Sequence, residues 1–207
     1  LCKMEAYKKW SRFILGLFIV SIGVVLTIKA ELGVSPWDVF HIGLTKHFDL
    51  TIGRAGQLTG IVIILLSYFL GGIKPKLGTV LNMLLIGFMI DGVMLVIPEP
   101  PVGQAFQYLY LFSGIIIFGI GAGMYISACC GTGPRDSLMM ALDYKLRFNI
   151  GLIRNGMEVI VLIIGYILGG PVGIGTLCFA LGVGPIVEFS LNLMNRFGDM
   201  SSVEAEC

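Results

Sequence analysis

Two aspartates stand two positions after a proline, in Pro36-x-Asp38 and in Pro134-x-Asp136. Proline is favoured at the first position of a helix, and an acidic side chain in the first turn can accept hydrogen bonds from unpaired backbone amides. The pattern therefore predicts that each segment starts a helix. Two interpretations of the carboxylates stay open: each caps its own helix, or the two helix starts face each other and hold a solute or ion between them.

The residues between proline and aspartate add binding chemistry to the second interpretation. Trp37 offers an aromatic face in the first motif, and Arg135 offers a guanidinium in the second. If the two helix starts meet, we expect Trp37, Asp38, Arg135 and Asp136 to contact the same solute.

Four further charged residues lie within apolar segments, where a charge is costly and often functional. Arg154 and Glu158 are four residues apart on a predicted helix, so we expect them to form an ion pair. Asp91 and Glu188 lie deep in two other segments. Their carboxylates either couple solute movement to protons or are simply solvated near the headgroups.

Signatures of enzymes are absent from the sequence. No cluster of His, Cys and acidic residues has the spacing of a metal site, and neither a phosphate-binding loop nor a nucleophile elbow is present. The five cysteines show no paired framework. We therefore expect no catalytic activity, no cofactor, no metal and no nucleic-acid partner.

The elements that carry these residues are strongly apolar. Hydrophobic residues make up 56% of the chain and charged residues 13%, with a mean hydropathy of +0.91. A soluble domain has about 25% charged residues, and a helix needs about 20 apolar residues to cross a bilayer. Six runs of that length predict six transmembrane helices: 12–30, 55–73, 78–97, 107–128, 152–170 and 173–194.

The chain also contains an internal repeat. Gly16 to Asp91 aligns with Gly114 to Glu188 at a shift of 98 residues, which becomes 97 after Gly72. Eight glycines, the Pro-x-Asp motif and the final acidic residue coincide in this register. The first apolar run resembles a signal peptide, but its repeat partner at 107–128 lies in mid-chain and favours a permanent helix. The repeats cover about 12–97 and 107–194 of a single membrane domain, 1–207.

Three spans in each repeat force the second copy to enter the membrane from the opposite side, so the repeats have inverted topology. Lys and Arg concentrate in segments 1–11, 74–77 and 129–151, whereas 98–106 and 170–172 contain none. Because cytoplasmic loops are enriched in these residues, both termini are predicted to be cytoplasmic, with 195–207 as a tail.

The two helices that start at the Pro-x-Asp motifs are too short to span. About 13 residues at about 1.5 Å each reach only about 20 Å. Each helix must therefore lie at the membrane interface or enter the membrane and return. Gly56-x-x-x-Gly60, which follows the first short helix, is interpreted as a helix-packing face.

Five strings of the sequence carry a resemblance to a known group: Gly131 to Met139, Arg154-x-x-x-Glu158, Leu168 to Thr176, Ser35 to Asp38 and Lys74 to Thr79. With them, nearly the whole chain resembles the YczE/YyaS/YitT group of bacterial integral membrane proteins. The resemblance implies a protein of the bacterial plasma membrane, in a group described either as candidate transporters or as uncharacterised membrane proteins. No substrate is implied.

The sequence thus predicts an all-α polytopic membrane protein with six transmembrane helices, arranged as two three-helix repeats of inverted topology, each with a short broken or re-entrant helix. The expected function is transport of an unidentified small solute by alternating access. A non-transporting accessory membrane protein and a passive channel are the alternatives. Besides the lipid bilayer and the solute, a second copy of the chain is an open partner.

Overall fold

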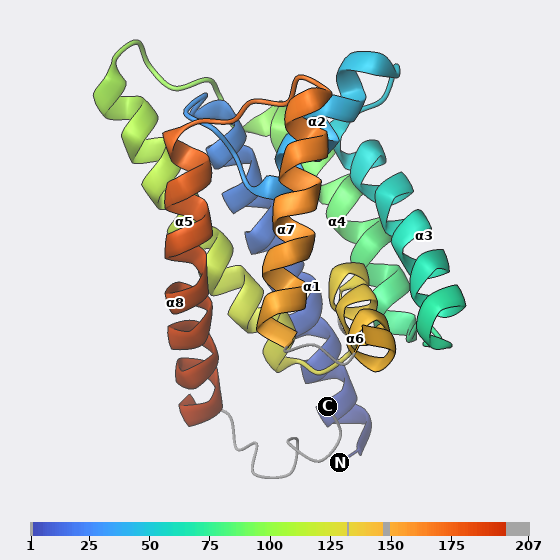
Figure 1. The fold of residues 1–207 in the computed structure, drawn as a ribbon. Coiled ribbons are helices and arrows are strands. Elements are labelled where there is room, and N and C mark those ends of the chain that lie inside the picture. The colour runs from blue at the N-terminus through green and yellow to red at the C-terminus, as the bar shows by residue number, and fades with distance from the viewer. Residues whose placement is uncertain (1, 132, 147–149, 198–207) are drawn as a thin grey trace.

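The computed structural model describes residues 2–131, 133–146 and 150–197, which form eight helices and no strand. The bundle is drawn in Figure 1, where α1 begins and α8 ends at the same end of the molecule. The helices are α1 (Cys2–Lys29), α2 (Pro36–His47), α3 (Ile52–Gly71), α4 (Leu77–Val96), α5 (Gln104–Ser127), α6 (Pro134–Leu146), α7 (Ile150–Ile167) and α8 (Ile174–Phe197).

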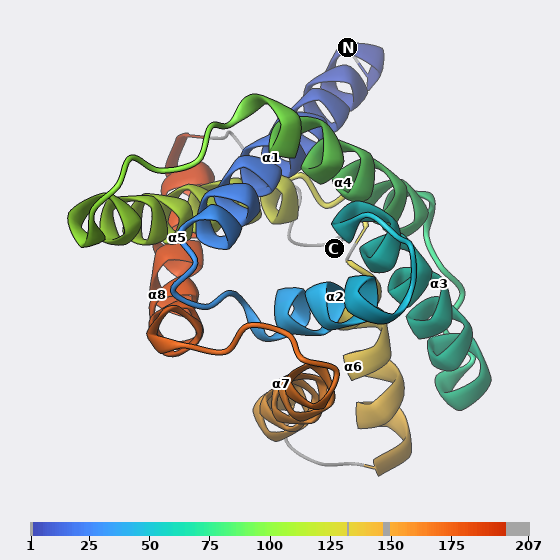
Figure 2. The same cartoon turned by 90° about the horizontal axis from the view of Figure 1, so that it is seen from above.

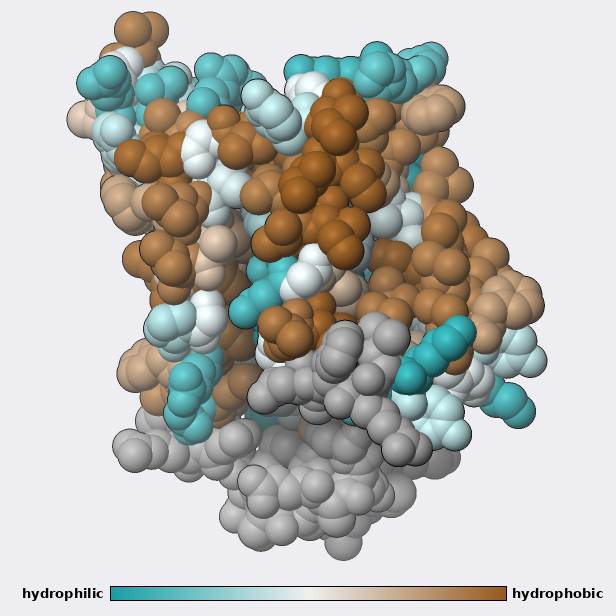
Figure 3. All heavy atoms as spheres, in the orientation of Figure 1, coloured by the Kyte–Doolittle hydropathy of each residue, from teal (hydrophilic) through white to brown (hydrophobic). Residues whose placement is uncertain are grey.

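Five helices are long and apolar enough to cross a membrane: Tyr7–Lys29, Ile52–Gly71, Leu77–Val96, Gln104–Ser127 and Ile174–Met194. Hydrophobic side chains cover most of the face shown in Figure 3, with hydrophilic residues gathered at its upper end. An apolar outer surface of this kind is stable in lipid rather than in water. The chain is therefore an all-helical membrane protein. The predicted span at 152–170 corresponds to α7, an 18-residue helix that is not among these five.

Both short helices begin at the predicted prolines. Pro36 opens α2, and the hydroxyl of Ser35 caps this helix by accepting a hydrogen bond of 3.2 Å from the Asp38 amide. Pro134 opens α6. The backbone turns into both helices through a glycine with positive φ, 104° at Gly33 and 147° at Gly131, a conformation that other residues rarely adopt. The prediction of two helix starts is confirmed.

Helices α1 and α5 cross in direct backbone contact. A Cβ atom on Gly16 would lie 2.6 Å from the backbone nitrogen of Tyr125, and one on Gly23 would lie 2.5 Å from that of Phe118. Any side chain at these glycines would separate the helices. Close approach through small residues is how helices associate in membranes, where lipid removes the hydrophobic driving force between them.

The short helices lie between the long ones. Helix α2 packs against α7 and α3, and α6 packs against α3 and α7. Seen from above in Figure 2, α2 crosses the interior of the ring that the other helices form. This arrangement places the starts of α2 and α6 among the long helices, where they can line one space.

Some predicted features lie outside the described residues. These are Thr132 of the second motif, Arg147 of the predicted cytoplasmic segment and positions 198–207 of the predicted tail.

Candidate functional site

A cavity of about 260 Å³ lies within the helix bundle and is lined by residues from all eight helices. Its walls are largely aliphatic, with charged side chains at the starts of α2 and α6 and on α7. Six of the eight predicted site residues line it: Trp37, Asp38, Arg135, Asp136, Arg154 and Glu158. The structure therefore brings together the two Pro-x-Asp motifs, which are almost 100 positions apart in sequence.

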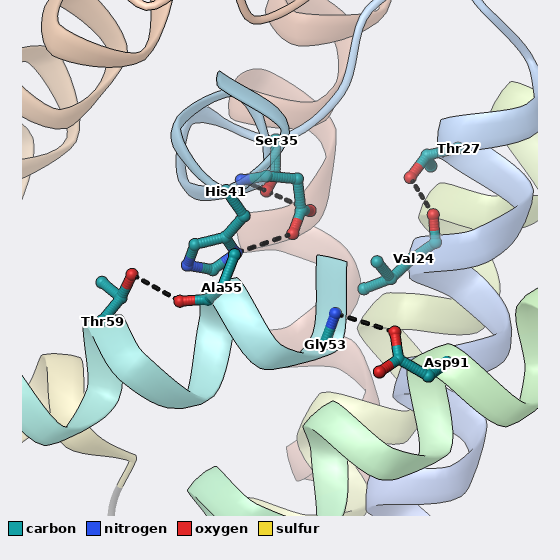
Figure 4. A network of polar contacts seen from close by, with 9 residues as sticks. Val24, Thr27, Ser35, His41, Gly53, Ala55, Thr59 and Asp91 are labelled. Atoms are coloured by element: carbon teal, nitrogen blue, oxygen red, sulfur yellow. Dashed lines mark hydrogen bonds and ion pairs between the residues drawn. The ribbon is translucent and has the colours of Figure 1, made fainter. Parts of the chain in front are cut away.

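The α2 side of the cavity holds a buried polar cluster. Asp38 is 4% exposed, and its Oδ2 accepts a hydrogen bond of 2.5 Å from the Ser35 hydroxyl. Its Oδ1 lies 3.6 Å from Nδ1 of His41 on the next turn. Figure 4 shows Ser35 and His41 in this cluster, beside α3. Asp38 is therefore hydrogen-bonded to Ser35, the residue that caps α2, and it also lines the cavity.

Helix α2, which carries this cluster, is not one of the five candidate spans. The charge states of Asp38 and His41 depend on their burial and on neighbouring charged groups. Burial lowers the pKa of His41, so the neutral imidazole is favoured despite the adjacent carboxylate. Burial alone would raise the pKa of Asp38, but His41 and Arg135 act against it, and the pKa lies below its ordinary value. An ionised Asp38 therefore faces a neutral His41.

The α6 side supplies a cation and a second carboxylate. The guanidinium carbon of Arg135 lies 4.4 Å from the centre of the Trp37 ring, so a cation–π contact joins the two helix starts. Burial raises the pKa of Asp136, while Arg135, Arg154 and the backbone of Gly133 act in the opposite direction. The two motifs therefore meet at the cavity, and at the start of α2 the cap is the Ser35 hydroxyl, to which Asp38 is hydrogen-bonded.

The predicted ion pair of α7 is present. Nε of Arg154 lies 3.7 Å from Oε1 of Glu158, and the two side chains are 65% and 35% exposed. Although both residues line the cavity, Arg154 is mostly accessible, so this pair borders the cavity at its open side.

Asp91 and Glu188 do not line the cavity. Asp91 joins α4 to the start of α3. Its Oδ1 accepts a hydrogen bond of 2.9 Å from the Gly53 amide (Figure 4). Its Oδ2 accepts one of 2.6 Å from the Thr51 hydroxyl. Glu188 lies on an exposed face of α8. A role for either carboxylate in proton coupling stays a prediction.

The two hydrogen bonds of Asp91 lead to a prediction about the stability of the protein. Asp91→Ala removes both hydrogen bonds and leaves the Gly53 amide at the helix start without its partner. Since hydrogen bonds to a charged group contribute about 1.5–3 kcal/mol, we expect the free energy of unfolding in detergent to fall by about 2 kcal/mol. Thermal unfolding followed by circular dichroism measures this, with Glu188→Ala as the matched control on an exposed face. Equal midpoints for the two variants would contradict the capping role of Asp91.

Two polar residues of the cavity were missed by the sequence interpretation. His41 is not among the predicted site residues, although its position three residues after Asp38 places both on one helix face. Asn82 on α4 is 6% exposed and lines the cavity. The signal for Asn82 was an amide within an otherwise apolar span, which is unusual enough to indicate a polar environment.

Within the described part of the chain, no group of three or more His, Cys, Asp or Glu residues is arranged to hold a metal ion. The cavity offers carboxylates, guanidinium groups and an aromatic face instead. Its chemistry is suited to recognising charged and polar groups of a small molecule.

Comparison with known proteins places the chain among bacterial membrane proteins and confirms the resemblance to YczE and YyaS. The uncharacterized membrane protein YczE of Bacillus subtilis (strain 168) is 40% identical over 191 residues, which cover 91% of this chain and 88% of YczE. An uncharacterized protein of Haemophilus influenzae is 32% identical over 190 residues, covering 92% of this chain and 86% of that protein. The uncharacterized protein YyaS of Bacillus subtilis is 26% identical over 190 residues, covering 91% of this chain and 94% of YyaS.

No solved structure matches this fold at a significant level. The family described as a family of unknown function, DUF6198, matches residues 7–192, which is most of the chain. The protein therefore belongs to the DUF6198 family.

Proposed function

We propose that the protein transports a small solute across the bacterial plasma membrane by alternating access, with the solute bound in the cavity between α2 and α6. The observation that carries the proposal is a cavity inside an apolar helical bundle whose lining includes charged side chains from α2, α6 and α7. Ionisable groups are costly within a membrane and typically mark a pathway for solutes or ions. An accessory protein has no need of such groups in its interior.

The proposed architecture is a pair of inverted repeats. In the register of 98 residues, Gly16 corresponds to Gly114 and Gly23 to Gly121. The backbone of Gly121 lies beside Gly16, and the backbone of Gly114 lies beside Gly23. If each residue of one contact is replaced by its repeat partner, the other contact results. This reciprocity is what a two-fold relation between the halves requires.

The packing of the short helices supports the same relation. Helix α2 of the first half packs on α7 of the second, and α6 of the second half packs on α3 of the first. The two connections behave likewise, because Gly33 lies beside Thr176 and Gly131 lies beside Thr79. We propose six spans, α7 included, with both termini cytoplasmic, in agreement with the distribution of Lys and Arg.

The two halves differ in one respect that alternating access needs. In the first half α3 packs against α4, and a Cβ atom on Gly53 would clash with the carbonyl oxygen of Gly87. Helices α7 and α8 are not a packed pair over their described residues, and a Cβ atom on Gly184 would meet nothing within 4 Å. We propose that transport exchanges these arrangements, closing α7 against α8 while α3 and α4 separate.

Substitution of Glu158 tests the proposal. Glu158→Gln preserves the shape of the side chain but removes the charge that pairs with Arg154 at the open side of the cavity. We expect the variant to fold normally in detergent and to lose most solute movement in proteoliposomes, because the pair no longer forms and breaks as the cavity opens. Uptake of a broad panel of small metabolites, first by the wild type and then by the variant, measures this.

Glu31→Gln is the control, since Glu31 is exposed in the connection between α1 and α2 and lies outside the cavity. A variant at Glu158 that transports like the control would contradict the role of the ion pair. A wild-type protein that moves no solute in the panel would favour the accessory-protein alternative, and uptake that never saturates would favour a passive channel.

A further inference from the structure

Two hydrogen-bond donors of the cavity have no partner among the described residues. The guanidinium of Arg135 stacks on Trp37, lines the cavity and has no hydrogen-bond acceptor among the described residues. The amide nitrogen of Asn82 is buried and likewise has no acceptor. Guanidinium presents five N–H donors in a planar fork, and buried donors are nearly always paired in folded proteins. An occupant that offers acceptor oxygens would satisfy both groups.

The carboxylates restrict the charge of that occupant. Arg135 interacts electrostatically with Asp38, Asp136 and Glu158. Glu158 is paired with Arg154, so the two helix starts hold two carboxylates against one guanidinium and carry an excess negative charge. A simple anion would increase this excess. A molecule that presents a carboxylate to Arg135 must therefore carry a cationic group as well.

The two carboxylates are not equally available to a cation. Asp38 already accepts a hydrogen bond from Ser35 and has His41 beside it. Among the described residues, Asp136 has no hydroxyl or imidazole beside it like those of Asp38, and its neighbours are Arg135, Arg154 and the backbone of Gly133. Its remaining acceptor positions are those best placed for an ammonium group, because an ionised carboxylate has about four lone-pair sites.

We propose that the cavity binds a small zwitterion of amino-acid size, whose carboxylate is held by Arg135 and Asn82 and whose ammonium group lies against Asp136. This ligand class rests on the proposed function. The cavity volume of about 260 Å³ accommodates such a molecule, and an aliphatic wall that includes Val20, Val24 and Ile90 accepts an apolar side chain.

Tryptophan fluorescence tests the ligand class directly. The chain has two tryptophans, so Trp10→Phe leaves Trp37 as a single reporter beside Arg135. Purified protein in detergent is titrated with the non-aromatic L-amino acids and 4-aminobutyrate, and ligand-induced thermal stabilisation is a second measurement of the same binding. We expect at least one probe to saturate in both assays. Its amide, which lacks the carboxylate, and its N-acetyl derivative, which lacks the ammonium group, should each bind at least about 10-fold more weakly.

Asn82→Leu, made in the same background, should lower the affinity for the best probe about 10-fold. The ratio of the affinities for this probe and for its N-acetyl derivative should stay the same. The proposal is overturned if the amide or the N-acetyl derivative binds as tightly as the parent, or if no probe binds in either assay. Uptake of the bound probe into proteoliposomes separates this proposal from the transport function. Binding without uptake would contradict transport alone, whereas uptake of solutes of another class without binding of any zwitterion would contradict the ligand class alone.

Discussion

Replacing Arg135 with Gln is expected to reduce solute uptake into proteoliposomes at least about 100-fold, a loss of about 2.8 kcal/mol in solute binding. The guanidinium joins the two helix starts through its contact with Trp37, and its N–H groups face the cavity without a partner among the described residues. Glutamine keeps a polar head but loses the charge and the planar fork that binds a carboxylate through two hydrogen bonds.

Arg135→Lys distinguishes solute recognition from a structural role of the charge. Removing the charge leaves Asp38 and Asp136 uncompensated, which destabilises a buried site by up to about 3–5 kcal/mol. Lysine retains the charge but cannot bind bidentately or stack in the same way. We expect Lys to restore the unfolding midpoint in detergent but not uptake. Arg54→Gln, on the exposed start of α3, is the control. Recovery of uptake by Lys would show that only a positive charge is needed at this position.

The helix starts could be predicted from the sequence because their causes are local. A proline at the first position and an acidic residue two positions later fix the beginning of α2 and of α6, whatever surrounds them. The apolar runs also predict the long helices closely, although α1 begins at Cys2, well before the predicted 12. Hydrophobicity marks the part of a helix that lies in lipid, and it does not mark an extension beyond the membrane.

The lining of the cavity could be predicted only in part, because the depth and the orientation of a side chain depend on tertiary packing. Asp91 and Glu188 occupy matching positions in the repeat, yet Asp91 caps α3 and Glu188 is exposed on α8. Asn82 corresponds to Phe179 in the same register, so the repeat gives no indication of its role. Such polar residues enter the site through the packing of α4 against its neighbours.

The glycines at the contact between α3 and α4 are matched by glycines in the second half. Gly53 on α3 and Gly87 on α4 correspond to Gly151 on α7 and Gly184 on α8, so both halves carry glycine at these two positions. Only α3 and α4 use this pair for close packing, while the surroundings of Gly184 are open. A second state in which α7 closes on α8 would use the open face of Gly184, a residue that also precedes Pro185 within α8.

Gly184→Leu is therefore expected to stop transport while leaving the described conformation intact. The structure has space for the side chain, since a Cβ atom there would meet nothing within 4 Å. If α7 must close on α8 during the cycle, the leucine blocks that closure and holds the protein in the described state. We expect uptake to fall more than about 10-fold, with an unchanged or higher unfolding midpoint and full binding of whichever solute the wild type moves.

Gly92→Leu is the matched control. Gly92 lies on α4, a Cβ atom there would also meet nothing within 4 Å, and its repeat partner is Phe189 rather than a glycine. The same substitution at this position adds equal bulk in a helix without blocking the proposed closure, so uptake should stay near that of the wild type. Normal uptake by Gly184→Leu would exclude closure of α7 against α8 as a step of transport. Loss of binding together with uptake would mean that the leucine disturbs the cavity itself, and the defect would then lie in recognition of the solute rather than in the exchange of states.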